Sequence, residues 1–128
     1  MAQPGRELHT QQVHYLRKRI TYADTFPVTV GVLPPGAIVI RGGVAVQTVF
    51  NANTTNVLDI GTSADDDGFA TDLALGTVGV IVADEMATSN DWYSTAAVTV
   101  TCTYAQTGTA ATTGVGHVWL EYIANNDG

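Results

Sequence analysis

The sequence has few charged residues, one cysteine and no long apolar run, and each of these absences excludes a class of protein. Only 13% of the 128 residues are charged and 45% are hydrophobic, whereas disordered proteins combine high charge with low hydrophobicity. The single cysteine, Cys102, cannot form a disulfide within the chain, so nothing points to an oxidising compartment. No run approaches the ~18 apolar residues of a membrane span, and the first residues lack the apolar core of a signal peptide. We therefore expect a protein that is made and folded in a cytoplasm and does not enter a membrane.

Threonine, valine and glycine dominate what is present. The chain contains 19 Thr, 16 Val and 13 Gly residues. Threonine and valine favour strands and, like glycine, are poor helix formers. A chain of this length is typically one domain. The composition therefore predicts a single β-rich domain.

Apolar and polar residues alternate in short segments that are separated by turns. The alternation is strictest from Val98 to Tyr104, where threonines occupy every second position and predict a half-buried antiparallel strand. Cys102 falls on the apolar side of this strand, and a thiol buried there has a raised pKa and is inert. In all, strands are predicted at residues 11–22, 26–33, 37–41, 44–50, 57–60, 78–82, 98–104 and 115–123, with Gly42-Gly43 as a bulge or bend between two of them.

About eight strands at this spacing predict an all-β fold, an antiparallel β-sandwich. Two sheets built from eight strands favour a jelly roll. We expect the sandwich domain to span residues 11–128. Residues 1–10 are polar and contain Pro4-Gly5, which predicts a flexible or partner-ordered N-terminal arm.

The sequence holds no recognisable catalytic or metal-binding motif. His9, His14 and His117 lack the spacing of converging zinc ligands, and no serine or glycine segment matches a nucleophile elbow or a phosphate loop. The three acids Asp65–Asp67 are consecutive, so they miss the calcium-loop spacing and their side chains are expected to diverge. We therefore predict no enzyme activity, no catalytic residue, no metal, no cofactor and no small-molecule substrate.

Charge is distributed unevenly along the chain. Four of the five Lys/Arg residues but one of the twelve acids lie in residues 1–19, so this segment is basic and the remainder is strongly acidic. An acidic body repels phosphate backbones, so we predict no nucleic-acid partner. The basic segment can dock on an acidic surface, or its cations can serve only to keep the terminus soluble. The candidate docking residues are Arg6, Arg17, Lys18 and Arg19.

The first and last predicted strands carry more apolar side chains than one small core needs. Val13 and Tyr15 lie on the cationic face of the first strand, and Trp119 and Ile123 lie on the second face of the last strand. Exposed apolar area of this kind is typical of an interface, so these four residues are predicted to form an oligomer interface. The alternative is that both faces are buried within one sandwich.

Three segments resemble a group of small virion accessory proteins of tailed bacteriophages, over residues 26–123. They are the turn and strand Leu33–Val39, the stretch Phe50–Gly61, which runs into the Asp-rich loop, and the late threonine-rich strand with its linker 107–112 and the closing residues 118–122. The resemblance implies a β-sandwich or jelly-roll protein of the capsid decoration or cement type, often trimeric. It assigns no site residues.

The resemblance implies a structural protein on the capsid surface of a virion, which would bind the major capsid protein as a homotrimer and stabilise the head. A second hypothesis is a carbohydrate- or host-receptor-binding module of a tail or fibre. That module would use Trp92, Tyr93 and a calcium-bound Asp65–Asp67 loop, although the aromatic pair can equally be a hydrophobic plug. A third hypothesis is a small hydrolase with two facing carboxylates.

Overall fold

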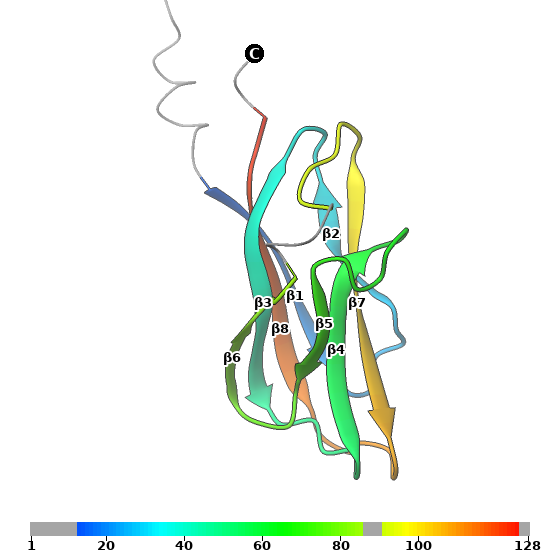
Figure 1. The fold of residues 1–128 in the computed structure, drawn as a ribbon. Helices are drawn as coiled ribbons and strands as arrows, with labels where there is room; N and C mark the ends of the chain where they lie inside the picture. Colours follow the sequence, from blue (N-terminus) through cyan, green and yellow to red (C-terminus); the bar gives the residue numbers. More distant parts are fainter. Residues whose placement is uncertain (1–12, 86–90, 126–128) are drawn as a thin grey trace, which may run out of the picture.

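The chain folds into two antiparallel four-stranded sheets packed face to face (Figure 1). The computed structural model describes residues 13–85 and 91–125. In this part of the chain, which holds no helix capable of spanning a membrane, all regular elements are strands. They are β1 (Val13–Thr21), β2 (Val28–Leu33), β3 (Ile38–Thr48), β4 (Thr55–Thr62), β5 (Ala70–Ala74), β6 (Gly79–Val82), β7 (Val98–Thr107) and β8 (Val115–Ile123). The predicted all-β antiparallel sandwich is confirmed.

The strands pair in a nested order, the first with the last. One sheet has the order β1-β8-β3-β6 and the other β2-β7-β4-β5. Within these sheets β1 pairs with β8, β2 with β7, β3 with β6 and β4 with β5, all antiparallel. The chain therefore passes between the sheets at nearly every connection, and distant segments become neighbours.

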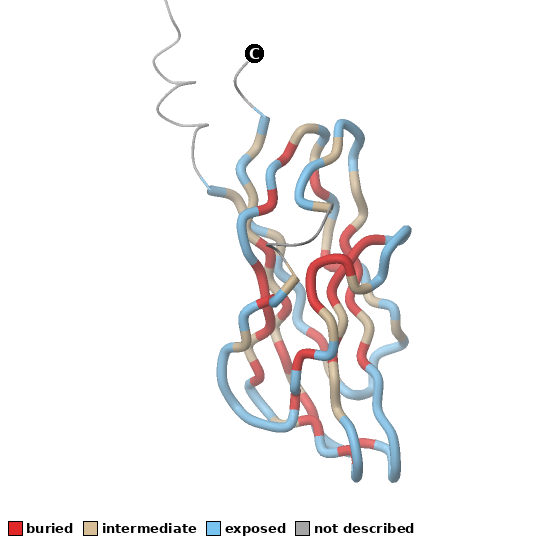
Figure 2. The backbone as a smooth tube through the Cα atoms, in the orientation of Figure 1, coloured by how far each residue is buried: buried red, intermediate tan, exposed pale blue. Residues whose placement is uncertain are grey.

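The core lies between the sheets, and most of its buried side chains are apolar. Figure 2 marks where the buried residues lie along the chain. Alternation along β8 buries Val118 and Leu120, and β7 buries Val100 and Cys102. The largest fully buried side chains are Phe50, Phe69, Ile20, Leu58, Ile60, Leu75 and Leu120. Burial of apolar area of this kind contributes about 25 cal/mol per Å².

The predicted break at Gly42-Gly43 is wrong, because β3 runs through both glycines without interruption. The register shifts of β3 against β8 lie on either side of the glycines, between Val39 and Arg41 and between Val46 and Thr48. Strand β6 passes so close to β3 that a Cβ on Gly43 would overlap the Ile81 carbonyl oxygen. Gly43 therefore admits a neighbouring strand at a position where the sequence indicated a bend.

Strand β5 was not predicted from the sequence, which showed no strand signal between residues 61 and 75. Its central residue, Asp72, has a φ of 54°, a conformation that non-glycine residues rarely adopt. The Asp72 backbone N–H donates to Asp59 Oδ1 on the neighbouring strand β4 at 2.8 Å. Tertiary contacts with β4 therefore hold a short strand whose own sequence does not favour one.

Two predictions concern residues outside the described part of the chain. The N-terminal arm at residues 1–10, with Arg6, lies outside it. The boundary of the sandwich domain at residues 11–128 stays a prediction for the same reason.

Candidate functional site

The predicted interface residues and one predicted docking residue meet on the outer face of the β1-β8-β3-β6 sheet. The register of β1 against β8 places Val13 opposite Ile123 and Arg17 opposite Trp119. Because side chains alternate along a strand, these residues and Tyr15 all point away from the core. Tyr15 is 66% exposed, and Trp119 is half-buried between its neighbouring strands. We call this face the Trp119 surface; its central residues are Tyr15, Arg17, Ala45, His117, Trp119 and Glu121.

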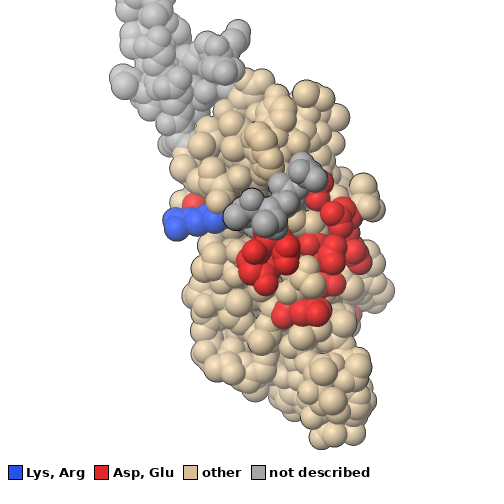
Figure 3. All heavy atoms as spheres, viewed as in Figure 1, with Lys and Arg blue, Asp and Glu red and all other residues tan. Residues whose placement is uncertain are grey.

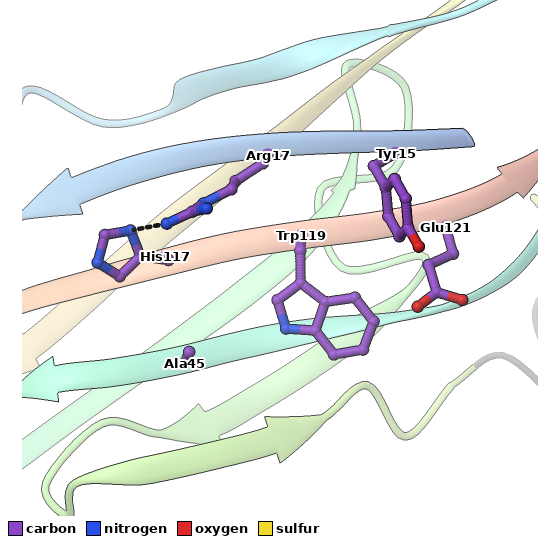
Figure 4. A pocket seen from close by; sticks show the side chains of 6 residues that line it. All are labelled: Tyr15, Arg17, Ala45, His117, Trp119 and Glu121. Atoms are coloured by element: carbon purple, nitrogen blue, oxygen red, sulfur yellow. Dashed lines mark hydrogen bonds between the residues drawn. The ribbon is translucent and has the colours of Figure 1, made fainter. Parts of the chain in front are cut away.

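A shallow hollow of about 360 Å³ lies at the centre of the Trp119 surface (Figure 4). The register of β3 against β8 places Gly43 directly opposite Trp119. Since Gly43 has no side chain, the indole can lie across β3, as Figure 4 shows. An aromatic anchor beside a hollow is the arrangement that concentrates binding energy at protein interfaces.

Polar contacts fix the side chains around the indole. Arg17 Nη2 lies 3.3 Å from His117 Nδ1, and His117 Nε2 lies 2.8 Å from Gln47 Oε1. On the other side, Arg41 Nε donates to Glu121 Oε2 at 2.9 Å. The hydrogen bond and charge of Glu121 raise the pKa of Arg41 above its ordinary value. The rim of the Trp119 surface is therefore polar and largely cationic around an apolar centre.

The predicted docking residues do not share one face. Arg17 and Arg19 alternate with Lys18, so the side chain of Lys18 points to the opposite side of β1. Lys18 and Arg19 line a separate depression beside the β1–β2 loop, with Asp24, Thr25 and Val28. Of the docking residues in the described part of the chain, only Arg17 contributes to the centre of the Trp119 surface.

The Lys and Arg residues of the described part all belong to one sheet, which also carries the acid Glu121. Within the described residues, Arg17, Lys18 and Arg19 belong to β1 and Arg41 belongs to β3, so all four lie in one sheet. Acidic side chains gather on another face, around β4 and β5 and the loop between them (Figure 3). The acids of these two strands and their loop are Asp59, Asp65, Asp66, Asp67 and Asp72. The outer face of the β1-β8-β3-β6 sheet carries Arg17, Arg19 and Arg41, the last paired with Glu121.

The expectation that the Asp65–Asp67 side chains diverge is wrong. One carboxylate oxygen from each residue lies within 4.8 Å of the others. The cause is a tight turn in which Asp65 and Thr62 exchange backbone hydrogen bonds and Gly68 N–H donates to the Asp65 carbonyl. Nearby, partial burial raises the pKa of Asp59, and its acidic neighbours add to that effect. Exposed acidic groups of this kind also occur without an ion, so the absence of a metal stays a prediction.

Cys102 is fully buried between the sheets, as predicted. Burial raises the pKa of its thiol to about 12. At neutral pH the thiol is therefore protonated, and it is a poor nucleophile.

Trp92 and Tyr93 are exposed but do not form a flat stacking platform. Their ring planes are inclined at 39°, with centroids 5.6 Å apart. The Trp92 carbonyl accepts a hydrogen bond from Val39 N–H, and Tyr93 forms a bridge with Ile38. Tyr93 also lines a polar cleft of about 390 Å³ with Ser63, Asp91 and Thr99. The pair thus fastens its segment to the start of β3.

Comparison with known proteins identifies structural neighbours in phage capsids. Neither a protein-family model nor a curated protein sequence matches the chain. A chain of the capsid asymmetric unit of cyanophage Pam1 aligns with a TM-score of 0.69 and 18% identity, over 91% of this chain and 87% of that chain. A chain of the acid-stable capsid of the Helicobacter pylori bacteriophage KHP30 aligns with a TM-score of 0.63 and 14% identity, over 87% of this chain and 86% of that chain. A chain of the capsid of Ralstonia phage GP4 aligns with a TM-score of 0.62 and 18% identity, over 89% of this chain and 85% of that chain. At these identities the likeness establishes a shared fold.

Proposed function

We propose that this chain is a structural, non-enzymatic virion protein of a tailed bacteriophage, a capsid cement that binds the major capsid protein and stabilises the head. The observation that carries the proposal is the Trp119 surface, an apolar centre with a cationic rim on an otherwise acidic protein. Such a surface suits a partner that presents acidic groups around an apolar patch, because complementary charge speeds encounter and fixes the docking register.

The lengths of the structural neighbours support an accessory role. Each alignment spans 85–87% of the neighbour and 87–91% of this chain, so the matched capsid chains are of nearly the same length as this one. Small chains that occur in many copies contribute modest individual contacts, which multivalency reinforces on a repeating shell.

The nested strand order supports the jelly-roll topology that the sequence favoured. Pairing β1 with β8, β2 with β7, β3 with β6 and β4 with β5 corresponds to one long antiparallel ribbon rolled into two sheets. We propose that the sandwich is a jelly roll, an architecture found in viral capsid proteins.

We assign the Trp119 surface to the capsid and not to a contact between copies. The predicted oligomer residues Val13, Tyr15, Trp119 and Ile123 lie on the same surface as Arg17. A homotrimer built on these residues would compete with the capsid for them. The cations of the rim instead favour an acidic partner over another copy of the same cationic face, because like charges repel.

Purified protein mixed with undecorated heads tests the proposed function. We expect saturable binding with a fixed number of copies per head, weakened by added salt because exposed charges are screened at high ionic strength. A sedimentation assay of head-bound protein measures both. If the protein stays unbound at low salt but is retained by immobilised glycans in the presence of calcium, the receptor-binding alternative holds and the cement proposal fails.

A further inference from the structure

The edge strand β6 differs from the other three edges of the sandwich. An exposed edge presents unpaired backbone groups, and proteins usually protect it with charges, prolines, bulges or irregular backbone. The edge strand β1 carries Arg17, Lys18 and Arg19, with Lys18 on the inward-facing side. β2 lies between Pro27 and Pro34 and has a register shift against β7. β5 has Asp72 at positive φ and a shift against β4.

Strand β6 lacks charges, prolines and a register shift. Its protection is limited to its length of four residues and to its first residue, Gly79, which has a φ of 142°. Residues Gly76–Val82 contain no charge and no proline, and β6 pairs with β3 without a register shift. Val78, Val80 and Val82 are 62%, 66% and 57% exposed, which is unusual for valines. Figure 1 shows β6 at the margin of its sheet, and no described strand pairs with its outer side.

The backbone of β6 is oriented to accept another strand. Ala83 N–H donates to the Gly42 carbonyl at 2.7 Å, and the register pairs Val82 with Gly43 and Val80 with Ala45. Hydrogen-bonding direction alternates along an antiparallel strand. The N–H and C=O groups of Val80 and Val82 therefore point away from β3, towards solvent.

We propose that β6 pairs with β6 of a second copy, antiparallel and centred on Val80, so that two sheets join across a twofold axis. Centring on Val80 pairs Gly79 with the second copy's Ile81, and it brings Val78, which directly precedes β6, near the second copy's Val82. By the same count Asp84 falls opposite Gly76, beyond the ends of both strands, so the acids that follow β6 are not opposed to each other. The edge is thus self-complementary in both shape and charge.

A second copy fits this edge better than it fits the cationic or the acidic surface, because each of those surfaces would meet like charge on the second copy. Two chains of formal charge −7 repel, and Gly76–Val82 is an uncharged segment through which they can approach. The contact is isologous and gives a dimer in place of the predicted homotrimer. It leaves the Trp119 surface free and does not depend on capsid binding.

Disulfide trapping of the full chain tests the register directly. In the proposed contact, Val80 of each copy faces Val80 of the other as a hydrogen-bonded antiparallel pair. The Cα atoms of such a pair lie about 5.5 Å apart, within the range of about 4.4–6.8 Å that a disulfide requires. We expect Val80→Cys to form a covalent dimer under mild oxidation. Buried Cys102 does not interfere. The matched control is Val32→Cys on the protected β2 edge, where valine is 53% exposed.

A second variant tests the same contact without cysteine chemistry. In sedimentation over a range of concentrations, we expect the wild type to approach the mass of a dimer. Val80→Lys is expected to remain monomeric with an unchanged melting temperature, and Val32→Lys to behave as the wild type. Equal crosslinking of both cysteine variants, or a trimer mass that Val80→Lys leaves intact, would overturn the proposal. Neither result bears on binding to heads.

Discussion

We expect Arg17→Glu to lower the affinity for heads at least about 30-fold, and Lys18→Glu to leave it within a few-fold of the wild type. The reason is the alternation along β1, which places Arg17 beside His117 at the centre of the Trp119 surface and turns Lys18 to the other side of the strand. Removing one partner of a buried interfacial charge pair costs about 2–5 kcal/mol, and 1.4 kcal/mol is tenfold in affinity. Binding of labelled protein to undecorated heads measures the difference.

Lys18→Glu is a matched control because it makes the same change of net charge one residue away. Both variants should melt at the wild-type temperature, since both side chains are exposed. Equal losses of affinity for the two variants would mean that the net charge of β1, and not the Trp119 surface, attracts the capsid. Full binding by Arg17→Glu would exclude the surface altogether.

Phe50→Ala has the largest expected effect on the fold. The Phe50 side chain, in the loop between β3 and β4, is fully buried, and its ring centroid lies 4.9 Å from that of Tyr104 on β7. Truncation of a buried phenylalanine to alanine costs about 3–5 kcal/mol. The free energy of unfolding of a small domain is about 5–15 kcal/mol, so Phe50→Ala removes a large part of the stability. Urea denaturation measures the change, and Val32→Ala on the surface should shift it by about 0.5 kcal/mol or less.

A second substitution shows whether the loss arises from this packing. A Cβ on Gly114 would lie 2.5 Å from the Phe50 ring, and Gly114 has a φ of 151°, so Gly114→Ala strains the wild type through both the clash and the backbone. In the Phe50→Ala background the vacated space accommodates that methyl group, and Gly114→Ala should cost less. Contacting residues are coupled in this way, whereas distant ones contribute additively. Additive costs would show that Phe50 and Gly114 do not share one packed site.

Strands with strict alternation could be predicted from the sequence, and strands imposed by neighbours could not. The last strand was predicted with the bounds that the structure gives it, Val115–Ile123. Strand β5 was missed because Ala70–Ala74 has few strand-forming residues and owes its conformation to β4. The break predicted at Gly42-Gly43 divided β3 into two strands, which offset the missing β5 in the total. The predicted number of strands was therefore right, although two of the predicted strands are halves of β3.

The candidate site was predicted in pieces that the sequence could not join. Alternation alone placed Tyr15 with Arg17 on one face of β1, and Trp119 with Ile123 on one face of β8. Joining these pairs requires the register of β1 against β8, in which Arg17 meets Trp119 across about a hundred residues of chain. No local pattern encodes that register. The three consecutive cations of the basic segment are part of β1, within the strand predicted at residues 11–22.

Oxidative footprinting of aromatic side chains, with and without heads, tests whether the Trp119 surface docks on the capsid. The chain carries an internal control, because Tyr15 and Trp119 are central residues of the proposed docking surface, whereas Trp92 and Tyr93 are exposed outside that centre, beside the start of β3. We expect head binding to protect Tyr15 and Trp119 from oxidation and to leave Trp92 and Tyr93 as reactive as in the free protein. Protection of Trp92 and Tyr93 alone would contradict it.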